Sequence, residues 1–564
     1  MQKILRLLII IAMLITAYLL ILAWQKDYPP GADSTSVVDA PSAQVSTSTD
    51  IPSASVADGD VPTTSTASTV PAGNQAPASA TGLISVTTDY YDIKINPVGG
   101  DIVYAALRPY SATLGSKERF VLFENTAQRV YVAQSGLIGQ DGVDTNSERA
   151  KYQYQSNQYV MQPNQETLTV PLTLTKDGVT ITKSFTFTKG KYPIDVSYTI
   201  DNETGKTWQG QLYTQIKRDG SKDPGMADKG ALSMATYLGG AWGTPDDDYN
   251  KLKFKDFNDG ELKSVSSDAG WVGVVQHYFV SAWTPKNFTG HFFSNEVSGN
   301  YFIGMKSQPI SIAPKSQETI SAVLYAGPKI QADLKGVAEG LNKTVDYGYL
   351  WPISKVLFAL LEGIHKVIGN WGWSIIVLTI LVKIALMWFS NKSYYSMAKM
   401  RALAPRLQAL KDEYGDDRMR MSQEMMALYK EEKVNPMAGC LPILLQMPIF
   451  LALYWVLVES VELRHAPWIL WIHDLSAMDP YFILPIFMGV TMFAQQMLNP
   501  QPTDPMQAKV MKFLPIIFTI FMLFFPAGLV LYWIVNNLFT IMQQYIVNKK
   551  VEKEQKQKEV KILS

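Results

Sequence analysis

Five long apolar segments between residues 350 and 546 restrict the fold of this chain more than any other feature. They cover residues 373–389, 441–458, 481–497, 513–525 and 529–546. A helix of about 20 apolar residues spans the hydrocarbon core of a bilayer. Segments of this kind at close intervals predict a polytopic α-helical membrane protein with a five-helix core at 371–546.

The N-terminal segment predicts a further span. Residues 7–24 are almost wholly apolar and follow Lys3 and Arg6. Eighteen residues of helix measure roughly 27 Å, which is close to the hydrocarbon thickness. We interpret 1–28 as an uncleaved transmembrane anchor with a cytoplasmic N-terminus. A cleaved signal peptide is the alternative, although the residues that follow form a poor cleavage site.

The region between this anchor and the core is polar. Residues 29–82 contain no aromatic residue, lysine or arginine, which predicts a disordered linker. Residues 83–345 predict a β-sandwich domain, because apolar and polar residues alternate along many short runs. Asp177-Gly178 lies between two such runs and predicts a hairpin turn. A short helix near 330–341 is expected to close the domain.

A helix that lies along the membrane surface is expected at 346–370. Apolar side chains recur at helical spacing from 353 to 368, and Lys355, Glu362, His365 and Lys366 lie mostly on the opposite side. This amphipathic pattern is typical of an interfacial helix.

The basic residues predict the orientation in the membrane. They gather in the 390–440 loop, in the 498–512 loop and in the basic tail 547–564, whereas the 459–480 loop contains only Arg464 and the 526–528 turn contains none. Basic loops stay in the cytoplasm. We therefore predict six transmembrane helices in the bacterial inner membrane, both termini in the cytoplasm and the large domain in the periplasm.

Motifs for catalysis and cofactor binding are missing from the sequence. It contains no phosphate-binding loop, no zinc-binding His-Glu motif and no nucleophile elbow, and its five histidines are scattered. The single cysteine, Cys440, cannot form an intramolecular disulfide. Its neighbours resemble a lipoprotein cleavage box, but a small packing residue fits its mid-chain position better. We expect no enzymatic activity, no cofactor and no metal site.

Lys383 is the most informative residue. It lies inside the first core segment, where a charge is costly and usually faces a polar cavity or a partner. We interpret it as the positive charge of a water-filled groove, and a side chain that extends to the cytoplasmic surface is the alternative. Other polar residues of the segments are Thr379, Gln446, Thr491, Gln495, Gln496, Thr519, Asn536, Asn537, Gln543 and Gln544. Among them, Thr379, Gln446, Gln495, Asn536 and Asn537 are our candidates for lining that groove.

The loop at 391–437 reads as a cytoplasmic helical hairpin with its turn at 415–417. Its arms contain Met397, Met400, Met419, Met421, Met425 and Met426. These methionines form either a seam between the two helices or a docking surface for nascent chains or targeting factors. The basic tail either binds ribosomal RNA or lipid headgroups or is simply solvated.

Several runs of residues are similar to a known family. They are 396–400, 422–430, 433–436, 439–442, 446–450, 471–476, 504–507 and 526–533, with a weaker match at 96–102. Together they resemble the YidC/Oxa/Alb family of membrane protein insertases, of the Gram-negative type with a large periplasmic domain.

The resemblance implies a function and a set of contacts. It implies an insertase and chaperone for inner-membrane proteins that works alone or with the Sec translocon, through a hydrophilic groove open to cytoplasm and lipid. It also implies a β-sandwich like that of galactose mutarotases. Lys383 stands where the family has an arginine, so contacts that need the planar guanidinium do not carry over. The implied substrate contacts are Phe450, Met488, Phe521, Phe524 and Trp533.

Two other functions are consistent with parts of the pattern. A solute transporter or channel would also use a charge inside the membrane, but we find no inverted repeat. A periplasmic sugar-binding domain on an anchor is the second alternative, and five further spans would be superfluous for it.

Overall fold

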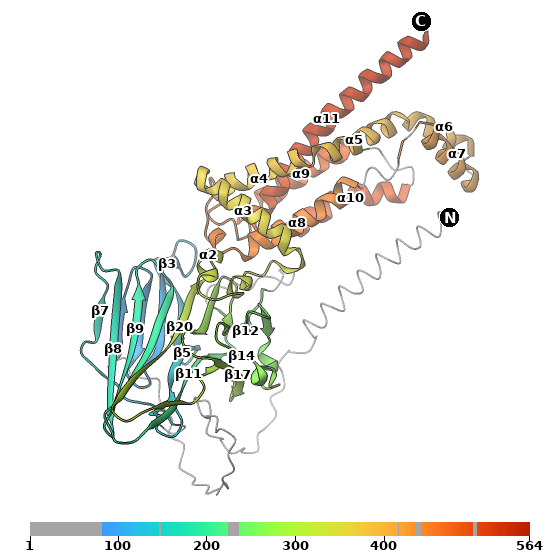
Figure 1. The fold of residues 1–564 in the computed structure, drawn as a ribbon. Helices are drawn as coiled ribbons and strands as arrows, with labels where there is room; N and C mark the ends of the chain where they lie inside the picture. Colours follow the sequence, from blue (N-terminus) through green and yellow to red (C-terminus); the bar gives the residue numbers. More distant parts are fainter. Residues whose placement is uncertain are drawn as a thin grey trace, which may run out of the picture. The chain divides into compact units, whose positions relative to one another are not determined.

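The computed structural model describes residues 82–145, 148–223, 236–414, 417–432, 434–435, 441–499 and 505–563. The predicted anchor at 1–28, nearly all of the predicted linker and Cys440 lie outside these residues. A β-structured region comes first and a helical region follows it (Figure 1).

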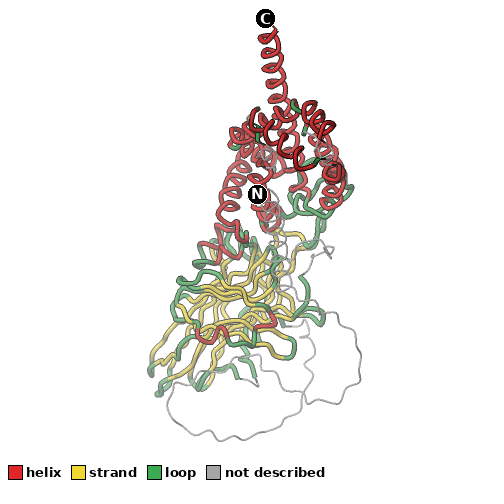
Figure 2. Tube along the Cα trace, turned by 90° about the vertical axis from the view of Figure 1, so that its right-hand side faces the viewer, coloured by secondary structure: helices red, strands yellow, loops and turns green. Residues whose placement is uncertain are grey.

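The β-structured region is a sandwich of two sheets, as predicted. Figure 2 shows its strands in yellow and the helical region in red. The first sheet contains β1 (Ile84–Thr87), β2 (Tyr91–Asn96), β3 (Asp101–Ser111), β4 (Arg119–Asn125), β5 (Val130–Ile138), β7 (Gln158–Val160), β11 (Trp208–Asp219), β14 (Ser266–Ser267), β17 (Gly290–Val297), β18 (Asn300–Lys306) and β19 (Ile310–Ile312). The second contains β6 (Gln153–Tyr154), β8 (Thr167–Lys176), β9 (Val179–Thr188), β10 (Pro193–Asn202), β12 (Gly239–Gly243), β13 (Asn250–Leu252), β15 (Trp271–Val275), β16 (Phe279–Pro285) and β20 (Ser316–Pro328). Nearly all neighbouring strands are antiparallel, and β1–β7 is a parallel pair.

The hairpin between β8 and β9 confirms the prediction from Asp177-Gly178. Both residues have positive φ angles, 53° and 82°, as a tight two-residue turn requires. Lys176 pairs with Val179 across the turn. Along β9 and β10 every second residue is buried, so the alternation in the sequence fixes which face packs into the core.

A cluster of buried charges explains the Gly99-Gly100 pair. Arg149 forms ion pairs with Asp101 (2.8 Å) and Asp144 (2.9 Å). Both glycines have positive φ, and a Cβ atom at Gly99 would come within 2.6 Å of the Arg149 side chain. A Cβ atom at Gly100 would come within 2.8 Å of Lys183, whose ammonium donates to the Gly99 and Ser135 carbonyls. The glycines thus let two long basic side chains reach the backbone.

The helical region contains α2 (Gln331–Lys335), α3 (Trp351–Ile368), α4 (Trp371–Ala385), α5 (Met387–Ala402), α6 (Ala404–Tyr414), α7 (Arg418–Glu431), α8 (Leu441–Glu459), α9 (Ile483–Leu498), α10 (Pro505–Met522) and α11 (Ala527–Leu563). The short 3-10 turns are η1 (Phe254–Asp256), η2 (Glu261–Ser264), η3 (Leu341–Thr344), η4 (Gly348–Leu350) and η6 (Val461–Leu463). In the predicted hairpin, Asp417 caps α7 by accepting hydrogen bonds from two backbone N–H groups.

Several predicted helices have other bounds in the structure, as α10 and α11 do, and two further differences concern where a helix ends or breaks. The helix expected at 330–341 ends at Lys335, because Gly336 follows it and Gly340 takes a positive φ of 78°. The segment expected as one span at 373–389 is broken at Leu386, where α4 and α5 meet at 68°.

Length and composition alone leave the number of spans open. Among the described residues, no individual helix is both long and apolar enough to cross a bilayer, whereas the bent pair α4–α5 is. Residues Leu444–Glu459 and Ile483–Leu498 form shorter apolar helices. The count of six spans therefore remains a prediction.

Buried polar contacts join the β-sandwich to the end of α8. Lys329, which follows β20, forms an ion pair of 2.9 Å with Glu459, and both side chains are buried. A ring nitrogen of His277 lies 2.8 Å from the Val458 carbonyl. In the segment after α8, Arg464 donates to the Ser111 carbonyl at 2.8 Å. The last turn of α8 is thereby fixed to the sandwich.

The buried Lys183 makes the stability of the sandwich depend on pH. Burial lowers the pKa of its ammonium to about 7, whereas an unfolded lysine titrates near pH 10.4, at about its reference value. Between these values the unfolded chain binds more protons, so the free energy of unfolding should rise with pH from about 7 to 9, by up to about 1.4 kcal/mol per unit. Urea unfolding of the full chain in detergent, followed by the far-ultraviolet signal of the β-sheets, would measure this slope.

In Lys183→Met this slope should disappear. The exposed Lys191 supplies the matched control, and Lys191→Met should keep the slope of the unchanged protein. An equal slope in all three proteins would show that Lys183 is not the group responsible.

Candidate functional site

The candidate site is a polar interior between α4, α9 and α11. The last of these helices packs against both of the others (Figure 1). On α4, Lys383 is only 5% exposed, and its ammonium donates to the Thr540 hydroxyl on α11 at 2.9 Å. Thr379 lies one turn earlier, is also buried, and donates to the Ile375 carbonyl. Lys383 is thus held inside the helical bundle and does not extend to its surface.

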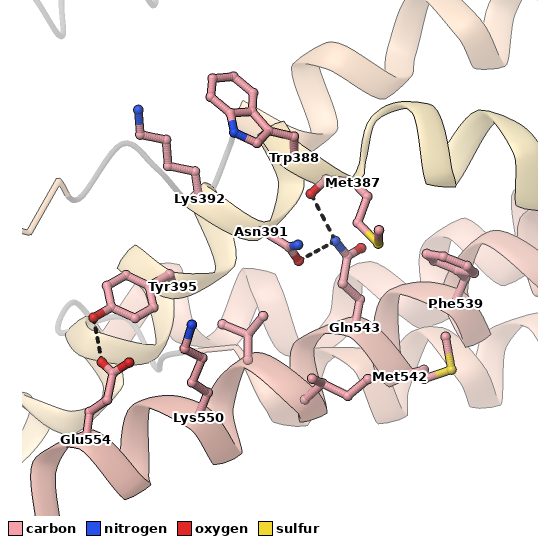
Figure 3. A pocket seen from close by; sticks show the side chains of 12 residues that line it. Met387, Trp388, Asn391, Lys392, Tyr395, Phe539, Met542, Gln543, Lys550 and Glu554 are labelled. Carbon is pink, nitrogen blue, oxygen red and sulfur yellow. Dashed lines mark hydrogen bonds between the residues drawn. The ribbon is translucent and has the colours of Figure 1, made fainter. Parts of the chain in front are cut away.

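One stripe of α11 faces α4 and α5. Asn536, Thr540 and Gln543 follow one another at the spacing that places residues on the same face of a helix. Gln543 donates to the Asn391 side chain at 2.7 Å and more weakly to the Met387 carbonyl at 3.4 Å (Figure 3). These bonds tie α11 to the first turn and a half of α5, directly after the bend at Leu386.

A second stripe of α11 faces α9. Asn537 donates to Thr491 at 3.2 Å, and Gln544 donates to Asn499 at the same distance. Asn537 is therefore a buried contact between helices. Hydrogen bonds of this kind are common between helices in membranes, where water cannot satisfy the amide.

The other two groove candidates lie apart from Lys383. Gln446 on α8 donates to the hydroxyl of the buried Tyr532 on α11. Gln495 is half-buried on α9. The structure therefore places Thr379 and Asn536 around the Lys383–Thr540 pair and places Gln446 two turns of α11 away from it.

The charge of Lys383 has little compensation. Among the described residues, no carboxylate forms an ion pair with it. Three buried amide oxygens of α11, those of Asn536, Gln543 and Gln544, also have no hydrogen-bond partner in the described structure. Buried polar atoms are usually paired with protein or water, so this interior is suited to accept a polar ligand or water.

The predicted substrate contacts fall into two groups. Phe521 and Phe524 are each 41% exposed, near the end of α10. Met488 is fully buried on α9. Phe450 is buried and stacks edge to face with the half-buried Trp533 at 4.7 Å. Only the two phenylalanines of the first group are open to a passing chain in this arrangement, and contact with substrate remains a prediction for all five.

Sequence reasoning missed Thr540, whose hydroxyl accepts the hydrogen bond of the Lys383 ammonium. It also left Gln543 out of the groove set. Their signal was the helical spacing from Asn536, which marks one polar face on α11. The sequence did not show which face of α11 meets Lys383. Any polar residue in an apolar helix can form a hydrogen bond between helices, so no polar residue identified that face by itself.

The described residues contain no candidate metal centre. Within that part of the chain, no three side chains of histidine, cysteine, aspartate or glutamate lie close enough together to bind a metal ion.

Comparisons with known proteins decide the family. The model of the YidC periplasmic domain matches residues 83–360, and that of the 60Kd inner membrane protein matches residues 363–555. The membrane protein insertase YidC of Pseudomonas aeruginosa is 48% identical over 578 residues, which cover 97% of this chain and 98% of the relative. That of a Marinomonas species is 48% identical over 551 residues, with 96% and 98% covered.

The chain belongs to the YidC family. The resemblance inferred from the sequence is therefore confirmed. A crystal structure described as an active YidC insertase with its first transmembrane domain resolved covers 83% of this chain and 93% of its own, at 17% identity and a TM-score of 0.38. The assignment rests on the sequence relatives.

Removal of the buried charge should stabilise the helical bundle. In Lys383→Met an apolar side chain of similar length replaces an ammonium with one hydrogen bond, and Thr540 stays satisfied because it also donates to the Asn536 carbonyl. We expect the midpoint of thermal unfolding in detergent to rise by about 3 °C or more, since functional charges often cost stability.

The exposed Lys430 on α7 provides the control for this measurement. Lys430→Met should leave the unfolding temperature of the bundle unchanged. A lower midpoint in Lys383→Met would mean that the ammonium contributes to packing.

Proposed function

We propose that this chain is an insertase and chaperone of the bacterial inner membrane, which moves hydrophobic segments of other proteins into the bilayer. The observation that carries the proposal is the 48% identity, over nearly the whole chain, to proteins named membrane protein insertase. The buried Lys383 within a polar interior adds a physical means of handling a polar segment inside the membrane.

The proposed topology has six spans with both termini in the cytoplasm. The spans are the N-terminal anchor and five core helices, of which α4 ends at the bend and α11 continues into the basic tail. Support comes from the basic residues on one side of the core and from the apolar composition of α4, α8, α9, α10 and α11. The sandwich at 83–345 then lies in the periplasm, the amphipathic helix at 346–370 lies on its membrane surface and the hairpin at 391–437 lies in the cytoplasm.

The first step of the proposed mechanism is electrostatic attraction between the translocated segment and Lys383. An acidic or polar translocated segment enters a hydrophilic groove and meets the charge of Lys383, which Thr540 holds in place. The unpaired amide oxygens of Asn536 and Gln543 offer acceptors to the same segment. The following apolar segment moves past the exposed Phe521 and Phe524 into lipid. Transfer of roughly 20 apolar residues into the bilayer supplies the driving force, so no nucleotide is needed.

The cytoplasmic hairpin is the proposed docking site for ribosomes or targeting factors. Some of its methionines form a seam between helices and others are exposed, as the two interpretations of the sequence required. Met400 and Met425 pack against a small core of Leu403, Leu407 and Val434, which makes them part of a seam. In contrast, Met419 is 74% exposed and Met426 is 43% exposed, so these two are open to an apolar partner. Larger clients would pass through joint action with the Sec translocon.

The charge of Lys383 should matter most for acidic clients. We expect Lys383→Glu to reduce insertion of a small single-span protein with an acidic translocated tail at least tenfold, and that of a matched neutral tail much less, because only the acidic tail is repelled. Purified protein in liposomes, with clients supplied by translation and insertion scored by protease protection of the tail, would measure this.

Two further variants distinguish the effect of the charge at position 383 from the effect of holding the ammonium in place. Lys383→Arg keeps the charge and should retain most insertion of both clients, whereas Thr540→Val frees the ammonium and should lower insertion of the acidic client only modestly. Equal loss for both clients in Lys383→Glu would remove the electrostatic step but keep the function. If the unchanged protein inserted no more than empty liposomes do, the insertase proposal would fail for the chain acting alone.

A further inference from the structure

A pocket of about 710 Å³ lies between α5 and α11, outside the polar interior (Figure 3). Its walls are the first turns of α5 and the stretch of α11 from Phe539 to Glu554. Gln543 lies at the boundary between the two spaces, because its amide bonds to Asn391 and to the Met387 carbonyl. The pocket is therefore distinct from the surroundings of Lys383.

One end of the pocket is apolar and faces outward. Trp388 is 66% exposed, Met542 is 51% exposed and Ile546 is 59% exposed, although all three are large apolar side chains. Exposed apolar side chains in such number mark a surface that contacts lipid or a partner. In a membrane protein family, this end of the pocket is suited to acyl chains.

The other end of the pocket is basic. Lys392 comes from α5 and Lys550 from α11; the Lys550 side chain extends toward α5, whereas that of Lys392 extends along the Trp388 side of α5 (Figure 3). The one carboxylate in the lining, Glu554, already accepts a hydrogen bond of 2.7 Å from the Tyr395 hydroxyl. Among the described residues, neither lysine has an ion-pair partner, and the Lys392 ammonium lies 5.5 Å above the Trp388 ring. The pocket therefore carries a net positive charge.

The two ends meet where the apolar part of α11 stops. Its exposed apolar residues end at Ile546, and Lys549 and Lys550 follow within one turn. Trp388 lies at the same border, as tryptophans do where membrane meets water. A basic pocket between helices at the cytoplasmic border is the kind of site that binds anionic lipid headgroups.

We propose that this pocket binds one anionic phospholipid of the inner leaflet. The flexible side chains of Lys392 and Lys550 turn toward the phosphate from α5 and α11, and the acyl chains lie over Trp388, Met542 and Ile546. A soluble anion would leave the apolar end uncovered, and a zwitterionic lipid would gain less from the two ammonium groups. A bound lipid would also bridge α5 and α11 just beyond the bend. The site rests on the proposed topology, in which this part of α11 reaches the cytoplasmic side, but it leaves Lys383 unused.

The test is a count of bound lipids on the intact, full-length protein in detergent by native mass spectrometry. Phosphatidylglycerol is added at low molar ratio, with phosphatidylcholine as the neutral comparison. We expect one tightly held phosphatidylglycerol and no equivalent phosphatidylcholine. The double variant K392E/K550E should weaken that binding about tenfold or more.

A matched control uses the same helix and the same change of charge. K549E/K553E reverses two exposed lysines of α11 that do not line the pocket, and it should keep the bound lipid. Met542→Trp fills the apolar end without a change of charge and should also weaken binding. Thermal unfolding of each variant confirms that it is folded.

Three outcomes would overturn the proposal. The first is an unchanged lipid count in K392E/K550E, and the second is an equal loss in K549E/K553E, which would indicate diffuse attraction to the whole tail. The third is displacement of the lipid by glycerol 3-phosphate or inorganic phosphate at equal concentration, which would show that the pocket takes a soluble anion.

Discussion

The buried ammonium of Lys383 is the constraint that the interior of the helical region has to satisfy. A charge inside a helical bundle needs a hydrogen-bond partner and a polar neighbourhood, or it is expelled toward water. Thr540 supplies the partner at 2.9 Å, and the polar face of α11 supplies the neighbourhood. The face of α11 that packs against α4 also bonds to α5 through Gln543.

The β-sandwich depends on a comparable arrangement. The partly buried Arg149 and the fully buried Lys183 lie beside Asp101 and Asp144, and the glycine pair at 99–100 gives them room. The sandwich in turn is joined to the last turn of α8 through the buried pair Lys329–Glu459. The last turn of α8 is therefore held by the β-sandwich.

Two regions of opposite character lie on either side of Gln543. On one side the interior around Lys383 is polar, and the unpaired amide oxygen of Asn536 lies on the same face of α11. On the other side the pocket between α5 and α11 is open, largely apolar and edged with lysines. The first suits a polar segment in passage, and the second suits a resident lipid. The bend at Leu386 brings both regions to the same pair of helices.

The sequence by itself determined the family, the order of a β-sandwich before a helical core, the hairpin at Asp177-Gly178 and the presence of an isolated charge, Lys383, within an apolar segment. These follow from local signals, namely the alternation of apolar and polar residues, the turn residues, the length of the apolar segments and the isolated charge. Only the tertiary structure decided that Thr540 meets Lys383, that Gln446 lies apart from it, that Met488 is buried and that the first core segment is broken at Leu386. Each of these depends on which faces of distant helices meet, and a single sequence does not encode that pairing in any local pattern.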